Sequence, residues 1–331
     1  MPPTEQPIAL TGGSGFVGSH VAEALLAAGY KVRALVRRPD RPGWLKGMRV
    51  EVVPGDVNDF EATCKLVEGV AAVVHVAGLT SAKELDEYRH CNAGGTKNVV
   101  TAVRRLAKDA HVVLVSSQAA AGPSPDGRPV KVGEACRPVS SYGKSKLEAE
   151  MILNGTKGIG YTILRPSAVY GPREKAIKDL FVLTSKGFTP ILGGGKPMIQ
   201  LVFAPDVARS VVAILERGPR GETFFAAHPE VLSYTDIARI LSRLRTPPAK
   251  LVNVSEGLVR VAGKVMGVIS FFREGPPVFN AEKANEMLQP AWVCDVGPAQ
   301  EALGSPFTTS FEKGAAATMN WYRDEGWIKG G

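Results

Sequence analysis

The stretch TGGSGFVGSH, residues 11–20, decides how the first half of the chain is interpreted. Gly12, Gly15 and Gly18 recur at every third position, between a short apolar run and a segment with the apolar spacing of a helix. A turn without side chains lets the backbone approach a pyrophosphate closely, and the helix that follows offers free N–H groups and a partial positive charge. The spacing departs from the G-x-G-x-x-G nucleotide fingerprint, so the position between strand and helix is what indicates nucleotide binding.

Strands and helices alternate outward from this motif. Short apolar runs predict strands, and apolar residues at helical spacing predict helices. The predicted strands are 7–11, 31–37, 50–56, 70–78, 111–117 and 160–166, and the predicted helices are 15–29, 59–69, 84–107 and 142–154. This alternation is typical of the α/β class, so we expect a doubly wound parallel sheet with helices on both faces.

Glycine and proline become more frequent after Arg165, and the regular alternation ends there. Helical spacing is found later at 204–216, 233–244, 256–270 and 310–325. We therefore expect a nucleotide-binding domain at 1–170 and a smaller mixed α/β substrate lobe at 171–331. Some later segments are expected to return to the first domain.

The composition is that of an ordinary soluble globular protein, with 44% hydrophobic and 22% charged residues among 331. The four cysteines are widely scattered, which predicts reduced thiols, and the five histidines lack metal-ligand spacing, so no metal is expected. The net charge of +8 is spread along the chain, so no nucleic-acid partner is expected. The sequence shows neither a signal peptide nor an apolar run of about 18 residues, and we expect a cytoplasmic location.

Several short motifs occur together in a known order, and through them the chain resembles the extended branch of the short-chain dehydrogenase/reductase superfamily. This NAD-dependent epimerase/dehydratase-like group includes 3β-hydroxysteroid dehydrogenases and dihydroflavonol reductases. The matching motifs are TGGSGFVG (11–18), GDV (55–57), HVAG (75–78), VSS (115–117), YGKSK (142–146) and LRPSAVYGP (164–172). The second half matches more loosely, through VFAPDVARSV (202–211) and FEKGAAATMNWYRDEGW (311–327). The resemblance implies a Rossmann fold and an NAD(P)-dependent enzyme.

Tyr142 and Lys146 are the first candidate catalytic residues. Residues four apart share one face of a helix, and a nearby ammonium lowers the pKa of a phenol from its usual ~10, which makes it a usable acid or base. The resemblance implies that Lys146 also binds the nicotinamide ribose and that Ser117 polarises the substrate oxygen, with Ser116 beside it. The alternatives are a solvated surface pair and strand-end serines that bind backbone.

The resemblance also implies a set of cofactor-binding residues. For Asn92, a buried asparagine that satisfies backbone is an almost equal alternative, and for Asp56 a turn or helix-cap role is the alternative. The implied residues are Gly12, Ser14, Gly15, Phe16, Val17, Gly18, Arg37, Asp56, Val57, Ala77, Gly78, Asn92, Ser116, Pro166 and Ser167.

Arg37 stands at the end of the second predicted strand, where NAD-binding members of the family often carry an acidic residue. The planar guanidinium suits a 2′-phosphate, which a carboxylate would repel. Arg33 or Arg38 could assist. We therefore expect NADP as the cofactor, with NAD possible; the alternative is a solvated arginine in an enzyme that accepts both.

Three departures from the family pattern argue against a nucleotide-sugar substrate. Ala168 stands where those enzymes usually have Asn, Ile199-Gln200 where they have Arg-Asp, and Gln118-Ala119-Ala120 where dehydratases have acidic residues. We therefore expect hydride transfer to or from a bulky apolar ketone or alcohol of steroid, terpenoid or phenolic type. The alternatives are a nucleotide-sugar epimerase or dehydratase with a tightly held NAD(P), and a non-catalytic nucleotide-binding protein.

The segment EGLVRVAGKVMGVISFF (256–272) is an apolar predicted helix with Arg260, Lys264 and, just beyond it, Arg273 as its cations. Packing of an amphipathic helix on the core ranks first, and a membrane-facing helix or a lid over an apolar substrate are the alternatives. A monomer or a homodimer through the helices near 84–107 and 142–154 is expected.

Overall fold

A seven-stranded parallel sheet forms the centre of the computed structural model, which describes residues 5–271 and 279–328. Its strand order is β11-β6-β5-β4-β1-β2-β3, and each neighbouring pair is parallel. The strands are β1 (Ile8–Thr11), β2 (Val32–Val36), β3 (Val50–Pro54), β4 (Ala72–His75), β5 (His111–Val115), β6 (Tyr161–Pro166) and β11 (Glu222–Ala226). The prediction of a doubly wound α/β fold is confirmed.

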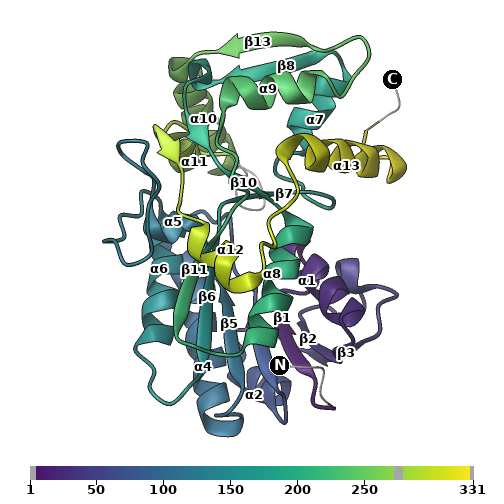
Figure 1. Cartoon of the computed structure of the whole chain (residues 1–331), viewed down its shortest axis with the longest axis vertical. Helices are drawn as coiled ribbons and strands as arrows, with labels where there is room; N and C mark the ends of the chain where they lie inside the picture. The colour runs from purple at the N-terminus through teal and green to yellow at the C-terminus, as the bar shows by residue number, and fades with distance from the viewer. Residues whose placement is uncertain (1–4, 272–278, 329–331) are drawn as a thin grey trace.

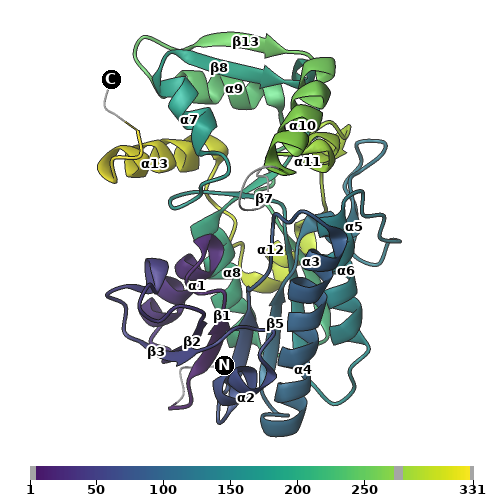
Figure 2. The same cartoon turned by 180° about the vertical axis from the view of Figure 1, so that it is seen from behind.

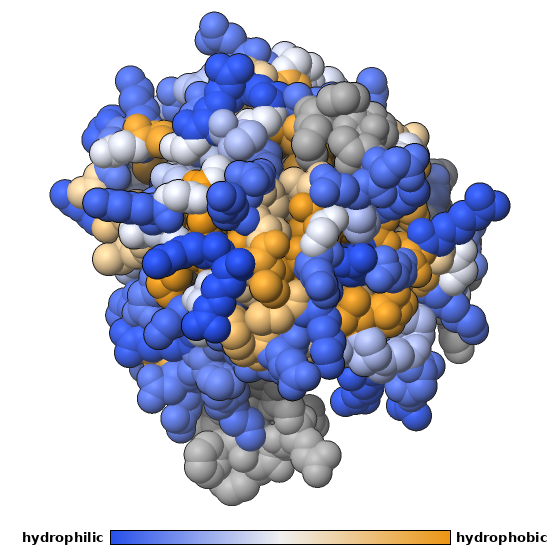
Figure 3. All heavy atoms as spheres, turned by 90° about the horizontal axis from the view of Figure 1, so that it is seen from below, coloured by the Kyte–Doolittle hydropathy of each residue, from blue (hydrophilic) through white to orange (hydrophobic). Residues whose placement is uncertain are grey.

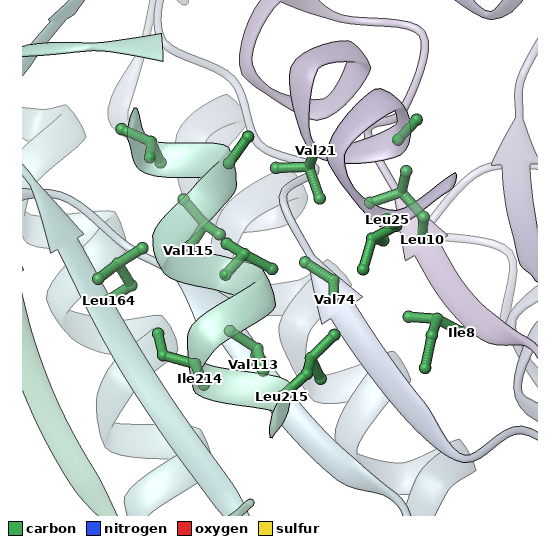
Figure 4. Packing of buried hydrophobic residues seen from close by; sticks show 14 of the residues in the cluster. Ile8, Leu10, Val21, Leu25, Val74, Val113, Val115, Leu164, Ile214 and Leu215 are labelled. Atoms are coloured by element: carbon green, nitrogen blue, oxygen red, sulfur yellow. The ribbon is translucent and has the colours of Figure 1, made fainter. Parts of the chain in front are cut away.

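Helices cover both faces of the sheet. Successive residues of a strand point to opposite faces, so each strand supplies side chains to both helix layers. Ile8 and Leu10 face one helix layer, α1 (Phe16–Ala27), α8 (Ala204–Arg217) and α12 (Gly297–Leu303), and Figure 4 shows this packing. Ala9, between them, faces the other core, which is formed with α2 (Phe60–Val67), α4 (Gly95–Leu106) and α6 (Ser141–Asn154).

The helix predicted at 84–107 is interrupted. It consists of α3 (Leu85–Tyr88), a π-helical segment η2 (Arg89–Gly94) and α4. Local apolar spacing does not distinguish a π turn from an α turn, so the interruption was not predicted. Such turns are frequent at functional sites, and this one contains Asn92.

Most of the elements after β6 form a second lobe, which Figures 1 and 2 show above the carboxyl edge of the sheet. Tyr170, Phe181 and Tyr322 are the largest buried side chains of its core. The chain enters this lobe after β6 and returns to the sheet with α8, β11 and α12. The lobe contains β7 (Ala168–Tyr170), α7 (Lys178–Ser185), β8 (Phe188–Leu192), β9 (Met198–Ile199), β10 (Leu201–Phe203), β12 (Leu232–Ser233), α9 (Tyr234–Ser242), β13 (Lys250–Val254), α10 (Glu256–Phe271), α11 (Ala281–Met287), β14 (Ala291–Trp292) and α13 (Phe311–Asp324).

Helix α10 differs from the expectation of an amphipathic helix packed on the core. Leu258, Val261, Val265 and Met266 are exposed, whereas Val259 is buried. Among the described residues, α10 packs chiefly against α11, through the side that carries Val259 and Gly263. The last residue of the predicted helix, 272, and the cation at 273 lie outside the described residues. No helix within 5–271 and 279–328 is long and apolar enough to cross a membrane.

Candidate functional site

The glycine loop is built by close contacts within itself. Gly12 has a φ of +71°, and a Cβ there would lie 2.6 Å from the backbone nitrogen of Ala77. A Cβ on Gly18 would lie 2.1 Å from the carbonyl oxygen of Gly12. These two glycines are therefore required by packing of the loop on its neighbours. Gly15, in contrast, is exposed, and a Cβ there would meet one atom within 4 Å, at 3.3 Å.

The first turn of α1 is open to an anion. Gly15 is its N-cap, no side chain of the described residues caps it, and its first turn has no acidic residue. The unpaired N–H groups and the positive end of the helix dipole therefore point out of the exposed loop. The loop residues Ser14, Phe16 and Val17 are half-buried around this end. This arrangement can hold a phosphate group.

The buried side chain of His75, at the end of β4, connects the end of β1 to α4. His75 Nδ1 lies 2.7 Å from Thr11 Oγ1, and its Nε2 lies 3.0 Å from Thr96 Oγ1. Burial lowers the pKa of His75 to about 3, and the charge of Lys146 acts in the same direction. The ring is therefore neutral. The N–H of Ala77 donates to Thr11 Oγ1 at 3.1 Å, so the network fixes the backbone at Ala77, and sequence reasoning missed both threonines.

Asn92 is occupied by other parts of the protein. Its Oδ1 accepts from the N–H of Leu79 at 2.7 Å, and its Nδ2 donates to Leu79 O at 3.1 Å and to Ser145 Oγ at 2.8 Å. The side chain holds the loop after β4 against α6, which is the backbone-satisfying role considered from the sequence, and the cofactor contact stays a prediction. A Cβ on Gly78 in that loop would lie 2.9 Å from Asn92 Oδ1 and 3.7 Å from Lys146 Nζ.

The structure brings Ser117, Tyr142 and Lys146 together between β5 and α6. Ser117 follows β5 and caps the short helix α5 (Gln118–Ala121), where its Oγ accepts from the N–H of Ala119 at 3.1 Å. The same hydroxyl is hydrogen-bonded to the phenol of Tyr142. Lys146 is 4% exposed, and its Nζ donates to Val115 O, at the end of β5, at 2.8 Å.

The environment shifts the pKa values of both helix residues. Desolvation raises the pKa of Tyr142 to about 12, against the opposing effect of the Ser117 hydrogen bond. Desolvation lowers the pKa of Lys146 to about 8, opposed chiefly by the charge of Glu150. The expectation that Lys146 lowers the pKa of Tyr142 is therefore wrong for this structure, because burial dominates. At neutral pH the phenol keeps its proton and can donate it.

Two carboxylates from the second lobe bind the first turn of α6, which carries Tyr142. Ser140 caps α6, with its Oγ accepting from the N–H of Gly143 at 3.1 Å, and the same hydroxyl donates to Glu286 of α11. One turn earlier in α11, Glu282 accepts from Ser141 Oγ at 2.7 Å. The charge of Glu286 also raises the pKa of Tyr142. Helix α11 thus holds the first turn of α6 in place.

Arg37 comes directly after the last residue of β2, at the carboxyl edge of the sheet. Its side chain is 74% exposed, and its Nε lies 3.7 Å from Asp56 Oδ2. Asp56 Oδ1 also accepts from the N–H of Asn58 at 2.9 Å, which is the turn role considered from the sequence. Arg33, in contrast, pairs with Glu51 at 2.8 Å within the sheet, so it is not available to assist Arg37.

Other predicted cofactor residues lie at the same edge of the sheet. The hydroxyls of Ser116, after β5, and Ser167, after β6, are buried, and neither has a hydrogen-bond partner among the described residues. Buried hydroxyls are nearly always paired, so two such groups fit polar atoms of a bound molecule. Pro166 ends β6 and is buried. The side chain of Val57 is also buried, against Gly95, so it leaves the backbone as the part able to meet a ligand.

Comparisons with known proteins agree with this geometry. The family model described as "NAD dependent epimerase/dehydratase family" matches residues 8–227. A ceramide reductase of Caulobacter vibrioides is 30% identical over 324 residues, which cover 97% of this chain and 96% of that protein. A putative dihydroflavonol 4-reductase of Synechocystis is 28% identical over 342 residues, covering 97% and 95%. The solved structure of MoeE5 in complex with UDP-glucuronic acid and NAD has a TM-score of 0.76 at 23% identity, covering 96% and 99%, and supports the fold.

Proposed function

The chain belongs to the NAD-dependent epimerase/dehydratase family, and we propose that within this family it is an NADP-dependent oxidoreductase of a bulky apolar ketone or alcohol. The observation that carries the proposal is the convergence of Ser117, Tyr142 and Lys146 at the carboxyl edge of the sheet, where ligands of doubly wound folds bind. Family members in this class are enzymes of the extended short-chain dehydrogenase/reductase type.

Each of the three side chains has a distinct task in the proposed reaction. The nicotinamide supplies hydride chemistry when it is bound. Ser117 binds the substrate oxygen and orients it, since its hydroxyl already reaches the Tyr142 phenol. Tyr142 donates its proton to that oxygen during reduction and accepts the proton back during oxidation. Its raised pKa keeps the phenol protonated at neutral pH, so the proton is present when reduction begins. Lys146 is held by Val115 O close to Gly78 and to the loop after β4, where a ribose hydroxyl would be bound.

The residues that line the glycine loop fit a dinucleotide. The uncapped first turn of α1 suits the pyrophosphate, and the unpaired hydroxyls of Ser116 and Ser167 suit polar atoms nearer the reacting end. The exposed guanidinium of Arg37 supports NADP, because a 2′-phosphate can reach it from solvent. Its ion pair with Asp56 is long at 3.7 Å and leaves most of its N–H groups for a ligand. NAD remains the alternative cofactor.

Two positions that carry polar residues in nucleotide-sugar enzymes support an apolar substrate in this chain. Gln200, which stands where those enzymes have Asp, is buried and used internally. Its Nε2 donates to His228 O at 3.2 Å, and its Oε1 accepts from the N–H of Cys294 at 2.7 Å. Ala168 offers no polar side chain. The names of the two relatives, a ceramide reductase and a putative dihydroflavonol reductase, support the same class.

The cofactor proposal is tested with Arg37→Asp. Removing the cation and adding a carboxylate should raise the KM for NADPH by at least tenfold, roughly the loss of one charge-assisted hydrogen bond of 1.5–3 kcal/mol, and should change the KM for NADH little. Arg220→Asp is the matched control, since it makes the same change of charge at an exposed arginine just before β11, at the amino edge of the sheet. Equal changes for both nucleotides would contradict a phosphate contact.

The reaction itself is tested by screening steroid, terpenoid, phenolic and sugar-nucleotide compounds with NADPH and with NADP⁺. We expect a change in nicotinamide absorbance with an apolar ketone or alcohol, and its loss in Tyr142→Phe while NADPH binding, followed by fluorescence, is kept. A sugar nucleotide converted without net change in the cofactor would support the epimerase alternative. Activity that survives in Tyr142→Phe would refute the assignment of the phenol.

The oligomeric state and the cytoplasmic location stay predictions. A monomer or a homodimer remains the expectation, and light scattering on the purified protein distinguishes them.

A further inference from the structure

Helix α10 presents a row of large aliphatic side chains to solvent. Leu258, Val261 and Val265 are 57%, 56% and 51% exposed, and Met266 is 42% exposed. Their spacing of three, four and one residues puts the first three on one helix face. Isolated exposed apolar residues are ordinary, and Figure 3 shows hydrophobic residues at the surface of the opposite end of the molecule as well. On α10, in contrast, the exposed apolar side chains follow one another along one face of the helix.

The opposite face of α10 is packed against α11. Val259 is buried, and a Cβ on Gly263 would lie 2.8 Å from Ala284 Cβ and 2.9 Å from Asn280 O. The helix therefore cannot turn its apolar row inward without losing this contact. In Figure 2 α10 lies at the front of the upper lobe, beside α11. The exposed row is thus a stable part of the surface of this lobe.

Two cations flank the row. Arg260 and Lys264 are one turn apart and exposed, and within the described part of the chain no carboxylate lies within ion-pair distance of either. Glu256 is the one acidic residue of α10, and it lies at the first turn. A row of aliphatic side chains beside unpaired cations complements a surface that is apolar inside and anionic outside.

The size of the described part of the row does not favour a second copy of the chain as its partner. The four exposed side chains described on α10 offer roughly 300–400 Å², whereas a stable dimer needs about 800 Å² from each subunit. Self-association would also bring the cations of α10 close to those of the other copy. A bilayer has neither restriction.

We propose that α10 is a membrane-docking helix, which lays Leu258, Val261 and Val265 into the headgroup boundary of a bilayer that contains anionic phospholipid. Through α11, which binds Ser140 and Ser141, the docked helix is connected to the first turn of the catalytic helix. Delivery of an apolar substrate from the bilayer would follow, and this last step alone rests on the proposed function.

The test measures partition of the full chain onto vesicles by sedimentation, with no substrate or nucleotide needed. Vesicles of phosphatidylcholine with about 30 mol % phosphatidylserine, or of phosphatidylcholine alone, are compared at low and physiological salt. We expect binding to the anionic vesicles that weakens with salt. Arg260→Gln/Lys264→Gln should weaken it about fivefold for each cation removed, roughly 25-fold together. Val261→Ser/Val265→Ser should weaken it at least about tenfold on either vesicle.

Matched controls keep the result specific to α10. Lys46→Gln/Lys108→Gln removes two exposed cations elsewhere, and Val132→Ser/Val231→Ser removes two valines of about 40% exposure from loops. Both should bind vesicles like the wild type, and all variants should keep the wild-type circular dichroism. The proposal is overturned if the wild type does not sediment, if the controls lose as much binding as the α10 variants, or if the valine variant abolishes self-association instead of vesicle binding. A wild-type protein that binds vesicles but transfers no hydride to any compound of the substrate screen would count against the proposed function and not against the docking helix.

Discussion

Replacing Lys146 by methionine should abolish activity and yet make the folded protein more stable at neutral pH. Lys146 is 4% exposed, and its burial lowers its pKa from 10.5 to about 8. The protein therefore keeps an ammonium group in an environment that disfavours it. Methionine has a similar length and no charge, so the desolvation cost is removed together with the group that is proposed to bind the ribose.

The size of the effect follows from the pKa shift. A shift of about 2.5 units corresponds to about 3 kcal/mol of destabilisation while both folded and unfolded chains carry the proton, below pH 8. Loss of the hydrogen bond from Lys146 to Val115 O costs about 1 kcal/mol, so the net gain at pH 7 is about 2 kcal/mol. As pH rises from about 8 to 10.5 the folded wild type loses its proton before the unfolded chain does. Its stability therefore rises, and the gap should shrink to within about 1 kcal/mol.

The assay is urea unfolding of both proteins at pH 7, 8, 9 and about 10, without added nucleotide. Comparing the two proteins at each pH cancels all other titrating groups. Lys144→Met, an exposed lysine of the same helix, is the control, and its free energy of unfolding should differ from wild type by the same amount at every pH. A Lys146→Met protein that is less stable than wild type at pH 7, or a gap that does not change with pH, would refute the argument.

Two further predictions concern buried carboxylates. Glu150→Ala should lower the free energy of unfolding by about 3–5 kcal/mol, because Arg165 Nη2, 2.6 Å from Glu150 Oε2, would stay buried without its partner; a loss below 1 kcal/mol in urea titrations would contradict this. Glu286→Gln should move the pH profile of alcohol oxidation to lower pH, because the Glu286 charge raises the pKa of Tyr142. Glu286→Asp should restore the wild-type profile, and an unchanged profile in the glutamine variant would show that Glu286 acts only through packing.

The sequence was sufficient to predict the elements whose pattern is local. The inner strands β1, β4 and β5 are buried on both faces and therefore appear in the sequence as apolar runs. Tyr142 and Lys146 share a helix face because of their spacing. Other features depend on packing between distant segments. The contact of Glu286 with Ser140 joins residues 146 apart in sequence. The direction of the Tyr142 pKa shift depends on desolvation by the folded chain, and no local pattern reports it.

The role of Asn92 shows the same limit. Two uses were compatible with its position in the sequence, and the hydrogen bonds that it makes to Leu79 and Ser145 depend on how the fold places those residues. The exposure of α10 is a second case. Its apolar composition predicts a buried face, but the number of neighbours available to cover it is a property of the whole lobe.

The path of the chain has a consequence for engineering. Strand β11 is part of the sheet and helices α8 and α12 pack on it, although all three follow β7 in sequence. Cutting the chain after residue 170 would therefore remove α8 and α12, two of the three helices of one layer, and would leave β6 as an unpaired edge strand that favours aggregation. A new substrate lobe should instead be grafted as several separate insertions. Residues 204–226 and 297–303 should be kept from the recipient, so that the sheet and its helix layers stay complete while the second lobe is exchanged.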